Sequence, residues 1–442
     1  MPEPTPISFL KVGFTDLDGV VRAKYIPNSK IQQSIKIGIG FCNVVFGWDM
    51  HDECYSKDSV SGWGTGFPDG VLKLDPTTLR KLPWEKEIEL YLGDFSEDPL
   101  LNAVCPRSLL KKILAQADEA GFQAKFGAEF EWFMFQKNSE DTSANNHQNL
   151  TPLSSGMFGY SMLRTSEFQE FTHRIISDLT AAKLRLEGLH TETGPGVYEA
   201  AISYSDALEM ADQSSLFKLG IKQIANEFDL MASFMAKWSP LYPGCGGHLH
   251  QCLWDEKGEN MFYSSDNEFG LSTVAQQYLA GQLYCLPFIL PMFAPTVNSY
   301  RRYLADSWAP TTLSWGVDNR TTAIRVVPEI SGGRHLEHRV SGADINPYLA
   351  ISACLASGLY GIKNKLPLTV EHCSGNAYKQ AKLSKLPESL TEAVHQMKHS
   401  DLASELFGES FVDHFILSRE WELEQSLGED WDWELQRYFE II

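Results

Sequence analysis

The chain has 442 residues, of which 43% are hydrophobic and 21% charged, so it can bury a large core in two or three domains. Its formal net charge of −20 at pH 7 argues against a surface that binds nucleic acid or an anionic membrane. The longest apolar stretch, residues 278–295, contains Gln282, Pro287 and Pro291, and therefore predicts a buried helix with a proline-broken exit and no membrane span.

The cysteines and the start of the chain bear on the cellular compartment. The eight cysteines are scattered and include no Cys-x-x-Cys pair, which is typical of reduced thiols and not of a disulfide framework. The first ten residues contain no basic segment followed by an apolar core, so we expect no secretory signal. Together these features predict a cytoplasmic protein.

The N-terminal part, residues 7–104, alternates short strand patterns with turn signals. Residues 7–19 predict a strand that enters a turn at Asp16–Gly19, and residues 20–27 and 86–95 predict further strands. Between them, Gly47–Pro68 is a long loop rich in aromatic residues, and its length favours either a function or burial against a neighbouring subunit. We place the first domain boundary between residues 104 and 105.

From residue 105 to residue 442, strand patterns alternate with helical ones. A polar loop is predicted at Asn138–Leu150. This order predicts the α+β class, with a small β domain at residues 1–104 and a larger body at residues 105–442. The predicted helices span residues 107–121, 167–182, 206–228, 271–288 and parts of 378–442, and the predicted strands include residues 125–135, 230–237 and 248–254.

The strand at residues 125–135 carries two carboxylates, Glu129 and Glu131, on the same face because they are two residues apart. Two like charges on a half-buried strand repel each other, and burying either one unpaired is costly. We therefore expect a cation or a basic cluster over this pair, although a solvated strand face is the ordinary alternative.

Three other pairs have a similar form. His248 and His250 are two residues apart on a strand, as are Glu337 and Arg339, while Glu192 and Glu199 flank a tight turn at Gly194–Gly196. If these elements are neighbours in one antiparallel sheet, five glutamates and two histidines share a site that suits Mg²⁺ or Mn²⁺. So many carboxylates favour two or more ions, as phosphoryl transfer commonly uses. Each pair alone is also explained by hydrogen bonding or a structural ion pair.

Arginines form a second group in the same part of the chain. Guanidinium groups bind carboxylate and phosphate in a bidentate fashion. Structural ion pairs at a domain or subunit interface are the alternative, above all for Arg301 and Arg334. Its members are Arg301, Arg302, Arg320, Arg325, Arg334 and Arg339.

In these segments the chain resembles the glutamine synthetase superfamily over nearly its whole length. The matching segments occur in the family's order, and they are residues 125–135, 190–200, 243–254, 298–310, 315–326 and 335–350. The resemblance implies an N-terminal β-grasp domain and a catalytic domain whose antiparallel sheet forms an active-site funnel. It also implies hexameric rings, often stacked as dodecamers, with active sites between subunits.

The same resemblance implies ligands and roles. Two or three Mg²⁺ or Mn²⁺ ions would be bound, with Glu131, Glu192 and Glu199 on the glutamate side and Glu129, His248 and Glu337 on the ATP side. Arg302, Arg320 and Arg339 would bind the glutamate carboxylates and the transferred phosphate. Arg325 would also bind phosphate, Gly244 would contact the amino acid through its backbone, and His190 and His250 would lie near the nucleotide. ATP would phosphorylate glutamate, and an amine would then attack the acyl phosphate in a site that excludes water.

Several positions depart from the family pattern. Trp308 replaces a flap glutamate that serves ammonium, and it cannot accept a proton, although it can pack against an alkyl amine or hold a cation. Asp306 is an alternative proton acceptor, and Asp49 is the candidate for the aspartate that a neighbouring subunit supplies. Thr191 and Val197 change the wall near the substrate, and Ser384 replaces the tyrosine that bacterial enzymes adenylylate.

These departures favour an ATP-dependent ligase that forms γ-glutamyl amides with an amine other than ammonia. A glutamine synthetase that uses ammonia is the first alternative. A non-catalytic structural or binding relative is the second, and it is disfavoured because metal ligands without a metal would destabilise the core.

Overall fold

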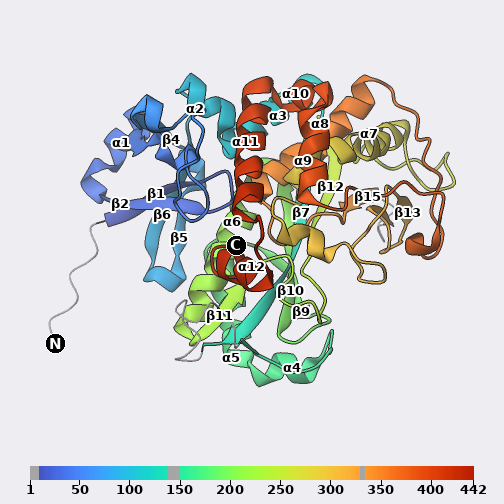
Figure 1. Ribbon diagram of the computed structural model, residues 1–442, viewed down its shortest axis with the longest axis horizontal. Helices are drawn as coiled ribbons and strands as arrows, with labels where there is room; N and C mark the ends of the chain where they lie inside the picture. Colours follow the sequence, from blue (N-terminus) through green and yellow to red (C-terminus); the bar gives the residue numbers. More distant parts are fainter. Residues whose placement is uncertain (1–8, 138–146, 148–149, 329–333) are drawn as a thin grey trace.

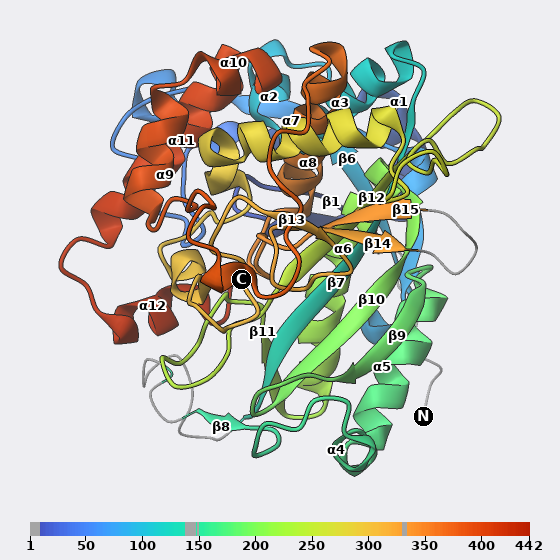
Figure 2. The same ribbon diagram turned by 90° about the vertical axis from the view of Figure 1, so that its right-hand side faces the viewer.

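The computed structural model describes residues 9–137, 147, 150–328 and 334–442 (Figures 1 and 2). Most of the loop predicted at Asn138–Leu150 lies outside these residues. Two sheets and a set of covering helices make up the chain, which confirms the predicted α+β class. No helix within these described ranges has the length and apolarity needed to cross a membrane.

The N-terminal sheet has six strands in the order β2-β1-β6-β4-β3, with β5 also paired to β6, and lies on the left in Figure 1. β1 pairs with β2 in antiparallel fashion and with β6 in parallel fashion. The strands are β1 (Phe9–Thr15), β2 (Val21–Pro27), β3 (Ile39–Cys42), β4 (Asp69–Leu74), β5 (Arg80–Leu82) and β6 (Ile88–Asp94), with helix α1 (Ile31–Ile37) beside them.

The second sheet has nine strands in the order β13-β14-β15-β12-β7-β10-β9, with β8 and β11 also paired to β7. All its pairs are antiparallel except β13 with β14. The strands are β7 (Gln123–Gln136), β8 (Thr151–Pro152), β9 (Leu186–Thr191), β10 (Val197–Asp206), β11 (Leu230–Ser233), β12 (Gly247–Trp254), β13 (Trp315–Val317), β14 (Ile324–Pro328) and β15 (Arg334–His338).

Helices cover this sheet and fill the upper right of Figure 1. α7 keeps Pro287 in its last turn, as the sequence indicates. The helices are α2 (Pro99–Val104), α3 (Pro106–Glu119), α4 (Met162–Glu167), α5 (Gln169–Ala181), α6 (Ala207–Glu227), α7 (Thr273–Ile289), α8 (Pro347–Lys363), α9 (Leu390–Lys398), α10 (Asp401–Phe407), α11 (Glu409–Gln425) and α12 (Trp431–Tyr438).

The central strand β7 fixes which side of the sheet is apolar. Phe130 and Trp132 are fully buried and contact Phe217 of α6, with ring centroids 6.0 and 5.6 Å apart. Side chains alternate along a strand, so Glu129 and Glu131 lie on the face opposite α6. Figure 2 shows β7, β10 and β9 side by side along this sheet.

One predicted strand is wrong in its extent. The strand predicted at residues 230–237 ends at Ser233, because the next residue, Phe234, donates its backbone N–H to the carbonyl of Ile442 and leaves the sheet. The helix predicted at residues 167–182 is confirmed to within two residues as α5, and Phe168, which has non-helical backbone angles, separates it from α4.

A buried arginine fastens the N-terminal sheet to the larger body. Arg107, near the start of α3, is 1% exposed and donates to Asp94 (3.0 Å), Asp75 (2.9 Å) and Asp212 of α6 (3.0 Å). Burial opposes the charge of the guanidinium, but Asp212 above all, with Tyr348 and Asp75, outweighs it and raises the pKa of Arg107 above its usual value. The boundary between residues 104 and 105 stays a prediction, although it coincides with the junction of α2 and α3.

Replacing Arg107 by methionine should destabilise the fold strongly. The change leaves the buried carboxylate of Asp212 without its cation, while Asp94 keeps only Lys111, and breaking a buried pair in this way costs about 3–5 kcal/mol of unfolding free energy. Urea denaturation followed by far-UV circular dichroism measures the loss. Lys385→Met, which breaks an exposed pair with Glu388, is the control and should leave the midpoint unchanged. Equal midpoints for the two variants would contradict this role of Arg107.

Candidate active site

The register of the second sheet brings the predicted pairs together. Glu131 on β7 is opposite Glu199 on β10, which is in turn opposite His190 on β9. On the other side of β7, Glu129 is opposite His248 on β12. Further along, Glu337 on β15 lies between His250 on β12 and Arg325 on β14. The predicted pairs on these strands are therefore neighbours in one sheet, which the sequence alone left open.

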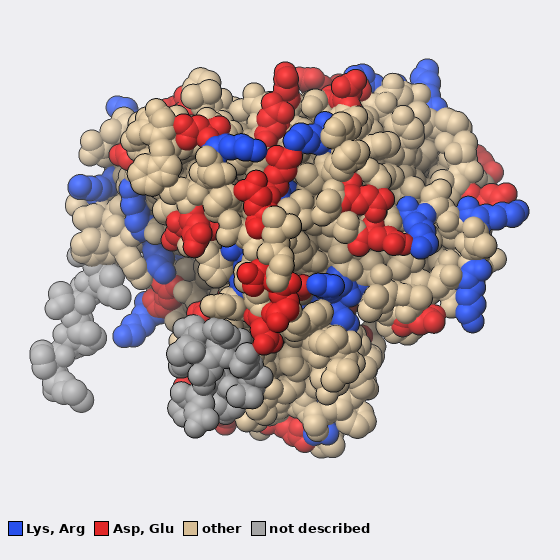
Figure 3. All heavy atoms as spheres, in the orientation of Figure 1, with Lys and Arg blue, Asp and Glu red and all other residues tan. Residues whose placement is uncertain are grey.

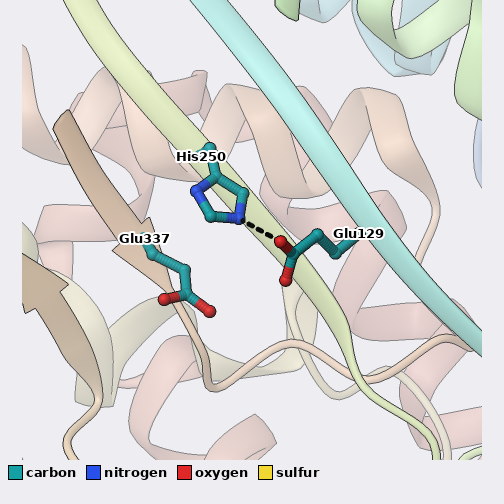
Figure 4. Close-up of side chains that lie close together, drawn as sticks. All are labelled: Glu129, His250 and Glu337. Carbon is teal, nitrogen blue, oxygen red and sulfur yellow. Dashed lines mark ion pairs between the residues drawn. The ribbon is translucent and has the colours of Figure 1, made fainter. Parts of the chain in front are cut away.

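Glu129, His248, His250 and Glu337 form the first cluster, which we call the histidine cluster. His250 Nε2 lies 3.2 Å from Glu129 Oε1, and His248 Nδ1 lies 3.7 Å from Glu129 Oε2 and 3.5 Å from Glu337 Oε1. One ligand atom each from Glu129, His250 and Glu337 lies within 4.8 Å of the others, and Figure 4 shows these side chains converging. The resemblance implies His248 in this set, and the geometry adds His250.

The charges of the histidine cluster favour ionised carboxylates. Burial opposes the ionisation of Glu129, but hydrogen bonds from His248 and His250 outweigh it and hold the pKa of Glu129 well below its usual range. Glu337 is fully buried, and the Arg339 guanidinium and both histidines overcome that burial and lower the pKa of Glu337 to about 2. Both carboxylates are therefore available as anionic oxygen ligands at neutral pH.

Glu131, Glu192 and Glu199 form the second cluster, which we call the glutamate cluster. Glu131 accepts a hydrogen bond from the backbone N–H of Gly246 (2.8 Å), and Glu199 lies 3.5 Å from His190. Burial and the charge of Glu199 raise the pKa of Glu131, although His248 acts in the opposite direction. A carboxylate that faces another carboxylate is harder to ionise, because the two like charges repel each other.

The chemistry of both clusters fits divalent cations such as Mg²⁺ or Mn²⁺. Carboxylate oxygens and imidazoles are ligands for such ions, and none of the described residues that line their cavity is a cysteine. A side chain at Gly246 would clash, since a Cβ there would lie 2.6 Å from His248 Nε2 and 3.2 Å from Glu131 Oε1. Only glycine lets the backbone approach both clusters this closely.

The arginines divide into two groups. Arg302 is 5% exposed and donates to the carbonyl of Val340 (3.0 Å), while Arg325 donates to Glu337 (2.9 Å) and Arg339 also contacts Glu337. These three and the exposed Arg320 face one cavity. Arg301 instead forms a structural ion pair with Glu434 (2.7 Å), and Arg334 donates to the carbonyl of Phe269 (3.3 Å); neither of these two lines the cavity.

Twelve of the predicted site residues line one cavity of about 490 Å³. Beside it is a second cavity of about 540 Å³, which shares Glu129 and Arg325 with the first and is also lined by His250, Tyr204 and Trp254. A larger cavity of about 920 Å³ lies between the N-terminal sheet and β11 and contains none of the predicted residues. The predicted residues in the first cavity are Glu129, Glu131, Glu192, Glu199, Gly244, His248, Arg302, Trp308, Arg320, Arg325, Glu337 and Arg339.

Sequence reasoning missed one aromatic residue of the first cavity. Tyr160 lines it and stacks on His190, with ring centroids 4.2 Å apart at 27°. The side chain is 73% exposed, and the backbone has a left-handed φ of 55° that is rare for a bulky residue. A lone tyrosine between a polar loop and a short helix gives no periodic signal by which it could have been found.

The prediction that Asp49 reaches the amine site of a neighbouring subunit is wrong. Asp49 is 3% exposed and accepts hydrogen bonds from Arg437 (2.8 Å) and Trp421 (3.0 Å) of its own chain. These partners outweigh its burial and lower the pKa of Asp49, and they tie the loop after β3 to α11 and α12. The buried carboxylate of Asp49 therefore has a structural role and is not accessible to a substrate.

Comparison with known proteins leads to the same conclusion as the geometry. Residues 103–438 match the family model described as glutamine synthetase, catalytic domain. The chain belongs to the glutamine synthetase family. It is 46% identical over 445 residues to type-1 glutamine synthetase 2 of Dictyostelium discoideum, an alignment that covers 98% of this chain and 84% of that protein.

Two further relatives extend the comparison within the glutamine synthetase family. The chain is 35% identical over 442 residues to the glutamate–isopropylamine ligase of a Pseudomonas species, covering 99% of this chain and 96% of that one. It is also similar to a solved complex of GmaS with ADP, at a TM-score of 0.82 and 27% identity, covering 97% and 96% of the two chains. The expected family and fold are confirmed, and the chain is a ligase of a family whose members use ATP and divalent ions.

Removing one carboxylate of the histidine cluster should weaken metal binding. Glu129→Gln keeps the size of the side chain but loses the anionic ligand, so we expect the affinity for Mn²⁺ to fall at least about tenfold, since even second-shell changes cost that much. Isothermal titration with Mn²⁺ measures the affinity. Glu187→Gln removes the same charge from the exposed rim of the second cavity and is the control. An unchanged affinity in Glu129→Gln would contradict the assignment.

Proposed function

We propose that this protein is an ATP-dependent ligase that joins the γ-carboxylate of glutamate to a primary amine other than ammonia. One observation carries the proposal: a single cavity holds five glutamates, His248 and four arginines, with Trp308 where the family resemblance implies a flap glutamate. Such a cavity can neutralise two anionic reactants, and it presents an aromatic wall to the amine.

The two clusters would hold the divalent ions, two or three in number and either Mg²⁺ or Mn²⁺. Glu131, Glu192 and Glu199 would bind on the glutamate side, and Glu129, Glu337 and a histidine on the phosphate side. When bound, the ions supply positive charge that draws the γ-phosphate and the γ-carboxylate together. The raised pKa of Glu131 and the convergence of Glu129, His250 and Glu337 support this assignment.

ATP would occupy the second cavity. Its aromatic lining, Trp254 and Tyr204, suits a purine, and His250 and His335 lie along the same wall. Arg325 and Glu129 line both cavities, so the transferred phosphate would pass between them at this junction. The similarity to a solved complex with ADP also supports a nucleotide here.

Glutamate would lie in the first cavity against the arginines. Arg302, Arg320 and Arg339 offer guanidinium forks for its carboxylates and for the phosphate. Gly244 would contact the amino acid through its backbone, because a Cβ there would lie 2.4 Å from Arg302 Cγ and 2.5 Å from the carbonyl of Ala236. No larger residue leaves that backbone accessible.

The reaction follows from this arrangement in two displacements. A γ-carboxylate oxygen of glutamate attacks the γ-phosphorus of ATP, and the bond to ADP breaks. The amine nitrogen then attacks the acyl carbon, the carbon–oxygen bond to phosphate breaks, and a proton leaves the nitrogen. Arg302, Arg320 and Arg339 would hold the leaving phosphate oxygens.

Synthesis of glutamine from ammonia is the second candidate. The relative at 46% identity is named a glutamine synthetase, and Asp306 lies exposed two residues before Trp308 as a possible proton acceptor on the same flap. Trp308 itself is 60% exposed with a left-handed φ of 65°. A residue held in such a strained conformation at a cavity mouth favours a contact with substrate.

A panel of amines separates these candidates. Phosphate release and mass spectrometry should show a γ-glutamyl amide with at least one primary alkyl amine at a kcat/KM above that for ammonium. Turnover with ammonium alone would contradict the proposal and leave glutamine synthesis. No turnover, with no ATP binding in Mg²⁺ by calorimetry, would indicate the non-catalytic relative.

We also propose a ring of subunits, hexameric or doubled to a dodecamer, at work in the cytoplasm. Trp63 is 75% exposed and packs edge-on against Phe67 within the long N-terminal loop, an aromatic surface suited to a neighbouring subunit. All eight cysteines carry free thiols, as a reducing compartment requires. The face in Figure 3 mixes acidic and basic side chains, with no broad basic area for a nucleic acid.

Assembly is open to direct measurement. Sedimentation velocity should give a species of six or twelve chains, and Trp63→Asp should reduce that mass, because a charge there is costly to bury between subunits. Lys385→Met, on the exposed surface, is the control. A monomer that turns over fully would rule out sites shared between subunits.

A further inference from the structure

The uncharged part of the first cavity indicates which amines fit. Apart from the two clusters, the four arginines and two glycines, the described residues that line the cavity carry no charge. They are Tyr160, Thr193, Pro243, Ser307, Trp308 and Ala309. A carbon chain that extends from the reacting nitrogen therefore meets aromatic and small side chains here, whereas a second ammonium group would find no carboxylate outside the clusters.

The two aromatic residues of this part share an unusual feature. Tyr160 and Trp308 both have left-handed backbone conformations, with φ of 55° and 65°, and both side chains are mostly exposed. Bulky residues seldom adopt this conformation, which persists only where the surroundings enforce it. Backbone strain at both aromatic residues of one cavity indicates that the positions of their side chains serve a function.

Thr191 enforces the placement of Tyr160. Its carbonyl accepts from the backbone N–H of Tyr160 (2.6 Å), and its hydroxyl donates to the carbonyl of Phe158 (3.1 Å) and accepts from the N–H of Ser161 (3.0 Å). The side chain is 3% exposed. The ring of Tyr160 then rests on His190, which is paired to Glu199 of the glutamate cluster. The threonine that departs from the family pattern is thus the anchor of the cavity's aromatic wall.

We propose that Tyr160 and Trp308 form the walls of a pocket for an apolar substituent, so that the preferred substrates are primary monoamines with small alkyl groups. Thr191 is a positioning residue that holds Tyr160 in place. This inference rests on the proposed amine ligase function and narrows it. Diamines and polyamines are disfavoured because the described lining outside the two clusters offers no carboxylate to pair with their second ammonium group, only the faces of the two rings.

The test compares n-butylamine with putrescine, which has the same four carbons and differs in a terminal ammonium group. We expect kcat/KM for n-butylamine to exceed that for putrescine at least about tenfold. Tyr160→Ala and Trp308→Ala should each bring this ratio towards one. Tyr284→Ala, at an exposed tyrosine that lines neither of the two site cavities, is the matched control and should preserve it.

The role of Thr191 has a separate readout. Thr191→Val removes the hydroxyl hydrogen bonds and should raise KM for n-butylamine several-fold while KM for glutamate and ATP stays unchanged. Thr191→Ser keeps the hydroxyl and should restore the wild-type value. A purely structural threonine would change all three KM values together, or none.

The outcomes distinguish the inference from the function on which it rests. If putrescine is preferred, or if the two alanine variants keep the ratio, the apolar pocket is wrong while the amine ligase remains. If only ammonium supports turnover, the proposed function fails and this inference fails with it. Where a variant does not fold, Trp308→Leu, which keeps an apolar wall, should keep the ratio above one, and a ratio below one would overturn the proposal.

Discussion

The repulsion between carboxylates on neighbouring strands is the constraint on which this structure depends. Glu129 and Glu131 occupy one face of β7, and the register places Glu199 and His248 beside them and brings Glu337 close. The opposite face is committed to the apolar core by Phe130 and Trp132, so the sheet cannot turn its charges outward. The charges therefore have to be balanced where they stand, by neighbouring cationic groups or by protonation.

The negative charge of the carboxylates is balanced differently in the two clusters. In the histidine cluster, His248, His250, Arg325 and Arg339 surround two carboxylates and keep them ionised. In the glutamate cluster, burial and the facing carboxylate of Glu199 raise the pKa of Glu131. A divalent ion bound between the two carboxylates would remove their repulsion. The same electrostatics that would otherwise destabilise the sheet thus creates affinity for the ions and for an anionic substrate.

Much of the site could be predicted because its residues come in pairs on strands, where a spacing of two fixes a shared face. The segments around Glu129, His248 and Glu337 carry this signal, and the antiparallel register of β7, β12 and β15 then brings them together. The helices at residues 107–121 and 206–228 were predictable to within two residues from their apolar periodicity. Such local patterns predict elements well because the apolar face that they define is the one buried in the core.

What could not be predicted depends on contacts between distant segments. The family resemblance made Asp49 the candidate for the aspartate that a neighbouring subunit supplies, yet Arg437, 388 residues later, binds its buried carboxylate within the same chain. Tyr160 gave no signal, and the sequence marked Thr191 only as a departure from the family pattern, because the contact between them joins the end of β9 to a distant loop. The strand predicted at residues 230–237 ends early, as β11, because Phe234 donates a hydrogen bond to the last residue of the chain. The spacing of residues along a sequence does not show which distant segments will contact each other.

The central claim, that separated acidic side chains hold divalent ions through which a nucleotide activates a carboxylic acid, is tested most directly by crystallography with Mn²⁺, ADP and a phosphorylated glutamate mimic. Anomalous peaks for Mn²⁺ should lie within coordination distance of Glu131, Glu192 and Glu199 and of Glu129 and Glu337, with the mimic between the two sets. Manganese bound elsewhere, with these carboxylates paired only to arginine and histidine, would contradict the account.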